Sequence, residues 1–382
     1  MRRSCFVAMA SASIASLLAG CDRDPAGVTA PDPFAKSICH DIEVTYSDPN
    51  TIDAPWSGGI KDFCIIRTDE GYHVFHITDP QTGWTSRQGE LTFGHATSPD
   101  LRNWTTHSRI DLRTGSNGWS PSFTWAPHVI RNGADGLYYM FYTGVDWPAG
   151  APPSQAVQKV GLARSPDLKE WQRYDEAGED GLILAGPNHE NFPWSAYDTD
   201  DLEIAWEYDC RDPFVFDRGA EYGLLRYVML NSIRLHPDLA PPWASYMAIA
   251  FATSRDLIHW QWRGYFPVTA DWVAESASIV QVGAVFYLFW TNRAPGPAVR
   301  VAYSTTGIFG DYVLANDGGW LFGAGNETLV EPAQLRYLAF DASYILHVKK
   351  NILLPAVPSP TIEIEIEEFT ACVADVQDRH AH

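Results

Sequence analysis

Five segments of the chain share a pattern of strands that returns along most of its length. Each begins with an apolar run carrying an acidic residue or a histidine near its start, and leads into a second run rich in Tyr and Phe. A pattern repeated on this scale indicates one structural unit used several times. The five openings are Lys61-Asp62-Phe63, Trp125-Ala126-Pro127-His128-Val129, Arg211-Asp212-Pro213-Phe214, Glu275-Ser276-Ala277-Ser278 and Glu331-Pro332-Ala333-Gln334.

The later part of each segment favours strands over helices. The second runs are β-branched and aromatic, and small, alternating third runs follow them. Three segments then close with the phrase Ser-x-Asp-Leu-x-x-Trp or its Ser-Arg-Asp-Leu variant, at residues 98–104, 165–171 and 254–260. We interpret this phrase as structural, because Ser and Asp can satisfy the amides of a turn while Leu packs inward and Trp begins an outer strand. Groups of about four strands, repeated five times, predict an all-β, five-bladed β-propeller, with a β-sandwich as the alternative.

Composition and charge limit the partners of such a domain. The chain has 382 residues, of which 46% are hydrophobic and 13% aromatic, so it can bury a large core. Its formal net charge of −20 and its lack of long Lys/Arg runs argue against nucleic acid or an anionic lipid surface. A carbohydrate is compatible with this surface. No Cys-x-x-Cys or His-Glu-x-x-His spacing indicates a metal site, so we expect no cofactor. A metal ion on the axis of a ring of strands would still be compatible with the sequence. We also expect the protein to be a monomer.

The N-terminus has the pattern of an export signal. Arg2 and Arg3 precede an apolar run too short to span a bilayer permanently, and this run ends in Leu18-Ala19-Gly20-Cys21. This ending resembles the lipobox of bacterial lipoproteins, so we expect Cys21 to be acylated and to hold an exported protein on a periplasmic or cell-surface membrane face. An ordinary cleaved signal with a chance cysteine is the alternative. We predict a signal peptide over 1–20, a tether over 21–40, the propeller over 41–370 and a C-terminal tail over 371–382.

Three of the first four openings carry an acid, and the four follow one another in a particular order. Lys61-Asp62-Phe63, Trp125-Ala126-Pro127, Arg211-Asp212-Pro213 and Glu275-Ser276-Ala277, with the repeated turns, resemble the five-bladed glycoside hydrolases of families 43 and 62, and more distantly the fructan-cleaving families 32 and 68. The resemblance runs from about residue 55 to about residue 350. It implies that Asp62 is the general base, that Asp212 tunes the acid and stabilises the transition state, and that Glu275 is the general acid.

Elementary electrostatics is consistent with these roles. A second carboxylate near Glu275, here Asp212, would disfavour its ionised form, as a general acid near neutral pH requires. Asp62 opens a strand of another blade, and a wide separation would leave room for an attacking water, so we expect inversion. The chain departs from the family pattern in two places, since Ser276-Ala277 follows the Glu and no proline follows Asp62. Taken singly, Asp62 is as compatible with capping the end of a strand as with catalysis. Asp212 is likewise as compatible with a structural ion pair in a turn as with catalysis.

Other polar and aromatic residues lie where loops and strand ends would reach the axis. Aromatic faces stack on sugar rings, and polar side chains hold sugar hydroxyls, although core packing and internal hydrogen bonds are the alternative for each. The candidates for substrate binding are Trp56, Trp125, His128, Arg293 and Glu331.

Cysteine usage suggests one disulfide. Cys39 and Cys372 lie near the two ends of the predicted domain, which a ring would bring together, so we predict that they pair. Cys64 and Cys210 each lie two residues from a candidate acid, and we interpret them as buried thiols.

The sequence therefore predicts a hydrolase of arabinose- or xylose-containing glycans. Two alternatives stay open: a surface glycan-binding propeller that has lost catalysis, and a glycoside phosphorylase, which would need two or more basic groups at the site to bind phosphate.

Overall fold

The computed structural model describes residues 61–78, 89–99, 104–113, 121–147, 150–152, 155–174, 182–197, 209–239, 246–282, 284–292, 298–314, 320–322, 334–337, 345–351 and 363–368. The regular secondary structure of these residues is almost entirely antiparallel β-sheet, joined by turns and loops and by three short helical segments, η5 (Ala220–Leu225), η6 (Pro237–Leu239) and η7 (Pro267–Thr269). Within these ranges we find no helix with the length and hydropathy of a membrane span. The predicted signal, tether, C-terminal tail and Cys39–Cys372 pair lie outside them.

Four sheets have the same up-and-down order of four strands. The first contains β1 (Lys61–Thr68), β2 (Gly71–Ile77), β3 (Phe93–Ser98) and β4 (Thr105–Thr106). The second contains β5 (Phe123–Arg131), β6 (Tyr138–Asp146), β7 (Val157–Ser165) and β8 (Gln172–Arg173), with β9 (Leu182–Leu184) on β7. The third contains β10 (Cys210–Asp217), β11 (Tyr227–Arg234), β12 (Met247–Ser254) and β13 (Gln261–Tyr265). The fourth contains β14 (Ala274–Val282), β15 (Val285–Asn292), β16 (Ala298–Ser304) and β17 (Val313–Leu314), with β18 (Trp320–Phe322) on β16.

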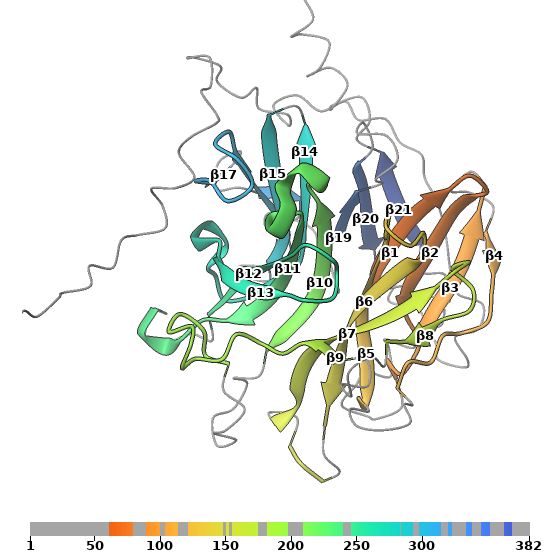
Figure 1. Ribbon diagram of the computed structural model, residues 1–382, viewed down its shortest axis with the longest axis horizontal. Coiled ribbons are helices and arrows are strands. Elements are labelled where there is room, and N and C mark those ends of the chain that lie inside the picture. Colours follow the sequence, from red (N-terminus) through yellow and green to blue (C-terminus); the bar gives the residue numbers. More distant parts are fainter. Residues whose placement is uncertain are drawn as a thin grey trace, which may run out of the picture.

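The fifth repeat forms a smaller sheet of β19 (Gln334–Tyr337), β20 (Ile345–Asn351) and β21 (Glu363–Glu368). The first strands of successive sheets contact one another, and β19 contacts both β14 and β1, which closes a ring. Figure 1 shows these sheets around a common centre. The predicted β-propeller is confirmed. However, the structure describes four complete four-stranded blades rather than five, because the fifth sheet has only three strands within the described residues.

The hydrophobic core lies between neighbouring blades rather than within one. Tyr139 and Phe141 of β6 pack with Met229 and Ile233 of β11, which joins the second blade to the third. A second cluster joins the third blade to the fourth, and a third cluster joins the first to the second. Since each sheet buries both faces against its neighbours, its central strands are apolar on both sides.

The repeated turn phrase has the structural role predicted for it. In the second blade the Ser165 hydroxyl accepts the N–H groups of Asp167 and Leu168, at 3.2 and 2.9 Å. The Asp167 carboxylate in turn accepts the N–H groups of Lys169 and Glu170. Leu168 is buried, and the Trp171 indole donates to its carbonyl oxygen. The copy at residues 254–260 makes the same contacts, so these tryptophans are held as blade-packing residues.

Candidate active site

The first strands of the four complete blades share an irregularity near their N-terminal ends. In each, one extra residue interrupts the pairing with the second strand and forms a β-bulge. One residue of every bulge has a positive φ, and these residues are Asp62 (44°), Ala126 (46°), Asp212 (59°) and Ser276 (50°). A bulge bends its strand and re-aims a side chain, and strained φ values of this kind cluster at functional sites. The strands therefore present equivalent positions at one end of the ring.

The sequence motifs occupy two positions of this repeated bulge. Asp62 and Asp212 stand at the positive-φ position, whereas Glu275 stands one residue earlier, at the position of Trp125 and Arg211 in other blades. All three candidate acids therefore lie at the same bulge of the first strand, each in a different blade.

Ser276 connects two of these acids. Its N–H donates to Asp212 Oδ2 at 3.0 Å, and its hydroxyl donates to Asp62 Oδ1 at 3.2 Å. Asp212 also accepts the hydroxyl of Ser232 at 3.2 Å, and its own N–H donates to Thr143 Oγ1 at 2.9 Å. Only 8% of Asp62 and 7% of Asp212 is exposed. The carboxylates of the first and third blades thus meet through a residue of the fourth.

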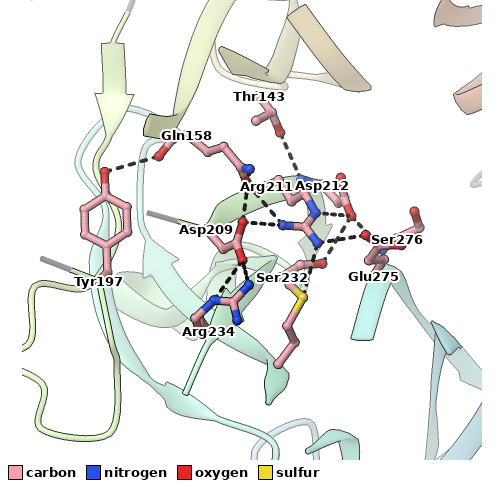
Figure 2. Close-up of polar contacts among 11 residues, drawn as sticks. Thr143, Gln158, Tyr197, Asp209, Arg211, Asp212, Ser232, Arg234, Glu275 and Ser276 are labelled. Carbon is pink, nitrogen blue, oxygen red and sulfur yellow. Dashed lines mark hydrogen bonds and ion pairs between the residues drawn. The ribbon is translucent and has the colours of Figure 1, made fainter. Parts of the chain in front are cut away.

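Arg211 brings in the third acid. Its NH2 group donates to Glu275 Oε1 at 2.7 Å, and its Nε lies 3.9 Å from Asp212 Oδ2 (Figure 2). The structure therefore places Asp62, Asp212 and Glu275 in one cluster from three blades, although they are more than two hundred residues apart at the extremes.

The electrostatic environment acts most clearly on Asp212. Burial raises the pKa of Asp212 from its ordinary value of 3.8 to about 6, and the negative charges of Asp62 and Glu275 act in the same direction. Arg211 and the Ser276 N–H oppose this rise. We expected the neighbouring carboxylate to act on Glu275, whereas the structure shows a raised pKa on Asp212. A carboxyl group with a pKa near 6 changes its charge in the mildly acidic to neutral range, where a catalytic carboxyl group can act as acid or base.

Sequence reasoning missed a buried ion cluster behind this site. Asp209 precedes β10, and its Oδ1 accepts Arg211 NH1 at 2.7 Å and Gln158 Nε2 at 3.0 Å. Its Oδ2 accepts Nε and NH2 of Arg234, at 3.2 and 2.7 Å (Figure 2). The signal was present in the alternation Asp209-Cys210-Arg211, because residues two apart in a strand share a face.

Two predicted substrate-binding residues lie in described strands. Trp125 is largely buried and packs with Phe123 and Trp147. His128 is half-buried, its Nε2 lies 3.1 Å from the Val215 carbonyl oxygen of β10, and its ring packs on Phe214. These contacts link the first strands of two blades, and a role for either residue in substrate binding stays a prediction. Trp56, Arg293, Glu331 and Cys21 lie outside the described residues.

Cys64 and Cys210 are both buried, as predicted. Burial, reinforced by the charge of Asp209, raises the pKa of the Cys210 thiol well above its ordinary value, so this group stays protonated beside the ion cluster. In the part of the chain that the structure describes, no group of three or more His, Cys, Asp or Glu side chains is arranged to hold a metal ion.

Part of the chain is similar in sequence to known proteins. Residues 63–212 match the N-terminal domain of glycosyl hydrolases family 32. A stretch of 109 residues is 28% identical to a 6(G)-fructosyltransferase of Asparagus officinalis, and it covers 28% of this chain and 16% of that protein. The chain therefore matches only a small part of the length of this curated relative.

Solved structures share the fold over most of the chain. An inulosucrase from Halalkalicoccus jeotgali bound to kestose has a TM-score of 0.59 at 15% identity, with 87% of this chain and 90% of that one covered. A thermostable family-43 glycoside hydrolase has a TM-score of 0.51 at 14% identity, with 85% and 92% covered. The resemblance to propeller glycoside hydrolases is confirmed. The matching sequence family is family 32, which the motifs had indicated as the more distant one.

Proposed function

We propose that this protein hydrolyses O-glycosidic bonds at the cluster formed by Asp62, Asp212 and Glu275. The observation that carries the proposal is the convergence of these acids on Ser276 and Arg211. Two carboxyl groups, one giving a proton to the leaving oxygen and the other acting on the opposite face of the sugar, are what this reaction needs. The fold and the family 32 match support the reaction class.

Each acid has a role that follows from its surroundings. Glu275 is the general acid, and Arg211 holds its Oε1 and so fixes the orientation of the carboxyl group. Asp62 is the general base that activates water, held by the Ser276 hydroxyl. Asp212 lies beside both, and its ionised form stabilises the positive charge that develops on the sugar in the transition state.

The sugar and the stereochemistry have two candidates. From the sequence motifs we propose arabinose- or xylose-containing glycans and inversion. The second candidate is a fructoside. It is favoured because the matching family model is that of glycosyl hydrolases family 32 and the matching relative is a fructosyltransferase. In that case Asp62 attacks the sugar directly and configuration is retained.

One experiment separates these candidates. The purified protein is incubated with nitrophenyl α-L-arabinofuranoside, nitrophenyl β-D-xyloside, sucrose and fructo-oligosaccharides, and proton NMR follows the first anomer released. Release of a pentose with inverted configuration supports the first candidate, and release of fructose with retained configuration supports the second. Binding of these sugars without release of any product would instead identify a glycan-binding module and defeat the proposal.

The site disfavours a phosphorylase. Arg211 and Arg234 are basic groups close to the acids, but both donate to carboxylates, which leaves their charge balanced rather than directed at a phosphate. A rate that does not depend on added inorganic phosphate is the expected result.

We also propose that the protein is exported and anchored through an acylated Cys21, on the strength of Leu18-Ala19-Gly20-Cys21. Mass spectrometry of the N-terminal peptide from a bacterial host tests this: a diacylglyceryl adduct on Cys21 supports it, and an unmodified thiol after cleavage contradicts it.

A further inference from the structure

The ion cluster behind the acids contains a carboxylate for which the proposed reaction has no direct use. Asp209 is 4% exposed and accepts four hydrogen bonds, from Arg211, Gln158 and Arg234. Placing charged side chains in such a site carries a large desolvation cost, which only a well-formed network offsets. The network is also anchored from outside, because the Tyr197 hydroxyl donates to the Gln158 carbonyl oxygen at 3.2 Å.

The two ends of the Arg211 guanidinium have different partners. NH1 donates to Asp209 and Gln158, at 2.7 and 3.3 Å, whereas NH2 donates to Glu275. Since the guanidinium is planar and rigid, holding NH1 also fixes the direction of NH2. Asp212 lies near Nε at 3.9 Å and is the nearest alternative carboxylate for this cation.

We infer that Asp209 is a positioning residue that holds Arg211 toward Glu275 and balances its charge. This inference rests on the proposed function of the cluster. The charged groups around Arg211 are Asp209, Asp212 and Glu275, with Asp62 and Arg234 beyond them, and the neighbouring Cys210 thiol is neutral. Without the carboxylate of Asp209, the positive charges of Arg211 and Arg234 lose the negative charge that they share. The Arg211 side chain can then turn toward Asp212.

The inference predicts opposite effects for the two partners of one ion pair. Asp209→Asn removes a negative charge, so Asp212 loses its proton more readily and the acidic limb of the kcat profile moves down by about one pH unit. Arg234→Gln removes a positive charge, so that limb moves up. Both variants weaken the hold on Arg211 and lower kcat by about 10-fold to 100-fold while KM changes little. A merely structural role would lower activity in both without opposite shifts.

Asp217→Asn is the matched control. Asp217 ends the same strand, β10, and forms a two-point ion pair with Arg226, at 2.9 and 2.8 Å, at the opposite end of the strand from the acids. Its kcat and pH profile are expected to equal those of the wild type. If Asp209→Asn fails to fold, the upward shift expected in Arg234→Gln decides the matter.

The failure of this inference and the failure of the proposed function give different results. Unchanged profiles in both variants of an active enzyme overturn the inference and leave the function standing. If the wild type hydrolyses no glycoside, the function fails, and the inference is decided by stability alone. The pH at which Asp212 begins to destabilise the fold is then measured by comparing each variant with its Asp212→Asn double variant. A downward move in Asp209→Asn supports the inference, and no move overturns it.

Discussion

Replacing Asp212 by Asn is expected to stabilise the fold while abolishing activity. Asn keeps the shape of the side chain and an oxygen that can accept from the Ser276 N–H and the Ser232 hydroxyl. What it removes is a carboxyl group whose ionisation the folded protein disfavours. A site built for catalysis often costs stability in this way.

The magnitude follows from the pKa. Burial raises the pKa of Asp212 from 3.8 to about 6, so the unfolded chain releases this proton before the folded one does. Because the folded pKa is the higher, the folded state is favoured most below pH 3.8, and this advantage is lost as the pH rises through about 6. Integrated over the two pKa values, the loss is about 2 kcal/mol at about pH 5 and about 3 kcal/mol at about pH 7.5. Asp212→Asn recovers these amounts.

Urea unfolding followed by tryptophan fluorescence at about pH 5 and about pH 7.5 measures the difference. Asp256→Asn is a control of opposite sign. Partial burial acts to raise the pKa of Asp256, but hydrogen bonds from His259 and Ile258 lower this pKa to about 2. Replacing the Asp256 carboxylate should therefore destabilise the protein at neutral pH. A gain for Asp212→Asn that does not grow with pH, or a loss at about pH 7.5, would refute the reasoning.

Two further predictions concern neighbouring polar groups. Ser276→Ala removes the hydroxyl that donates to Asp62, so kcat should fall by about 10-fold, whereas Ser165→Ala, which removes a turn hydroxyl, should change stability alone; equal kinetic effects would contradict this. In the first blade, His73 and His95 are 3.0 Å apart, and burial lowers their pKa values to about 4 and about 3. The neutral rings contribute stability above pH 6.5, and this contribution is lost as the pH falls toward 4. His73→Phe should therefore reduce the fall in melting temperature between pH 6.5 and about pH 4. An unchanged fall would show that other groups cause it.

The sequence was sufficient to predict the propeller because the repeat is written into local chemistry. The turn phrase around Leu168 and Leu257 satisfies its own backbone amides, so its structure depends on neighbours in the chain. The fourth repeat lacks this phrase and still forms a complete blade, whereas the fifth, which also lacks it, has three strands within the described residues. Asp62, Asp212 and Glu275 could be found together because each lies at the bulge near the start of the first strand of its blade.

The electrostatics of the site could not be predicted in the same way. The pKa of Asp212 depends on its burial and on Asp62, which is 150 positions away in the chain. The partner of Glu275 proved to be Arg211, whose side chain could equally have paired with the adjacent Asp212. Such choices depend on how the blades pack, and no single motif contains them.

The proton donor is the most direct test of the account. Glu275→Gln preserves size and can still accept from Arg211, but it has no proton to give, so kcat on unactivated oligosaccharides should fall by about 1,000-fold or more, with folding intact by circular dichroism. On a nitrophenyl glycoside, whose leaving group needs little protonation, the loss should be far smaller. An exposed Glu190→Gln variant serves as the control. Turnover of oligosaccharides by Glu275→Gln at the wild-type rate would contradict the central claim.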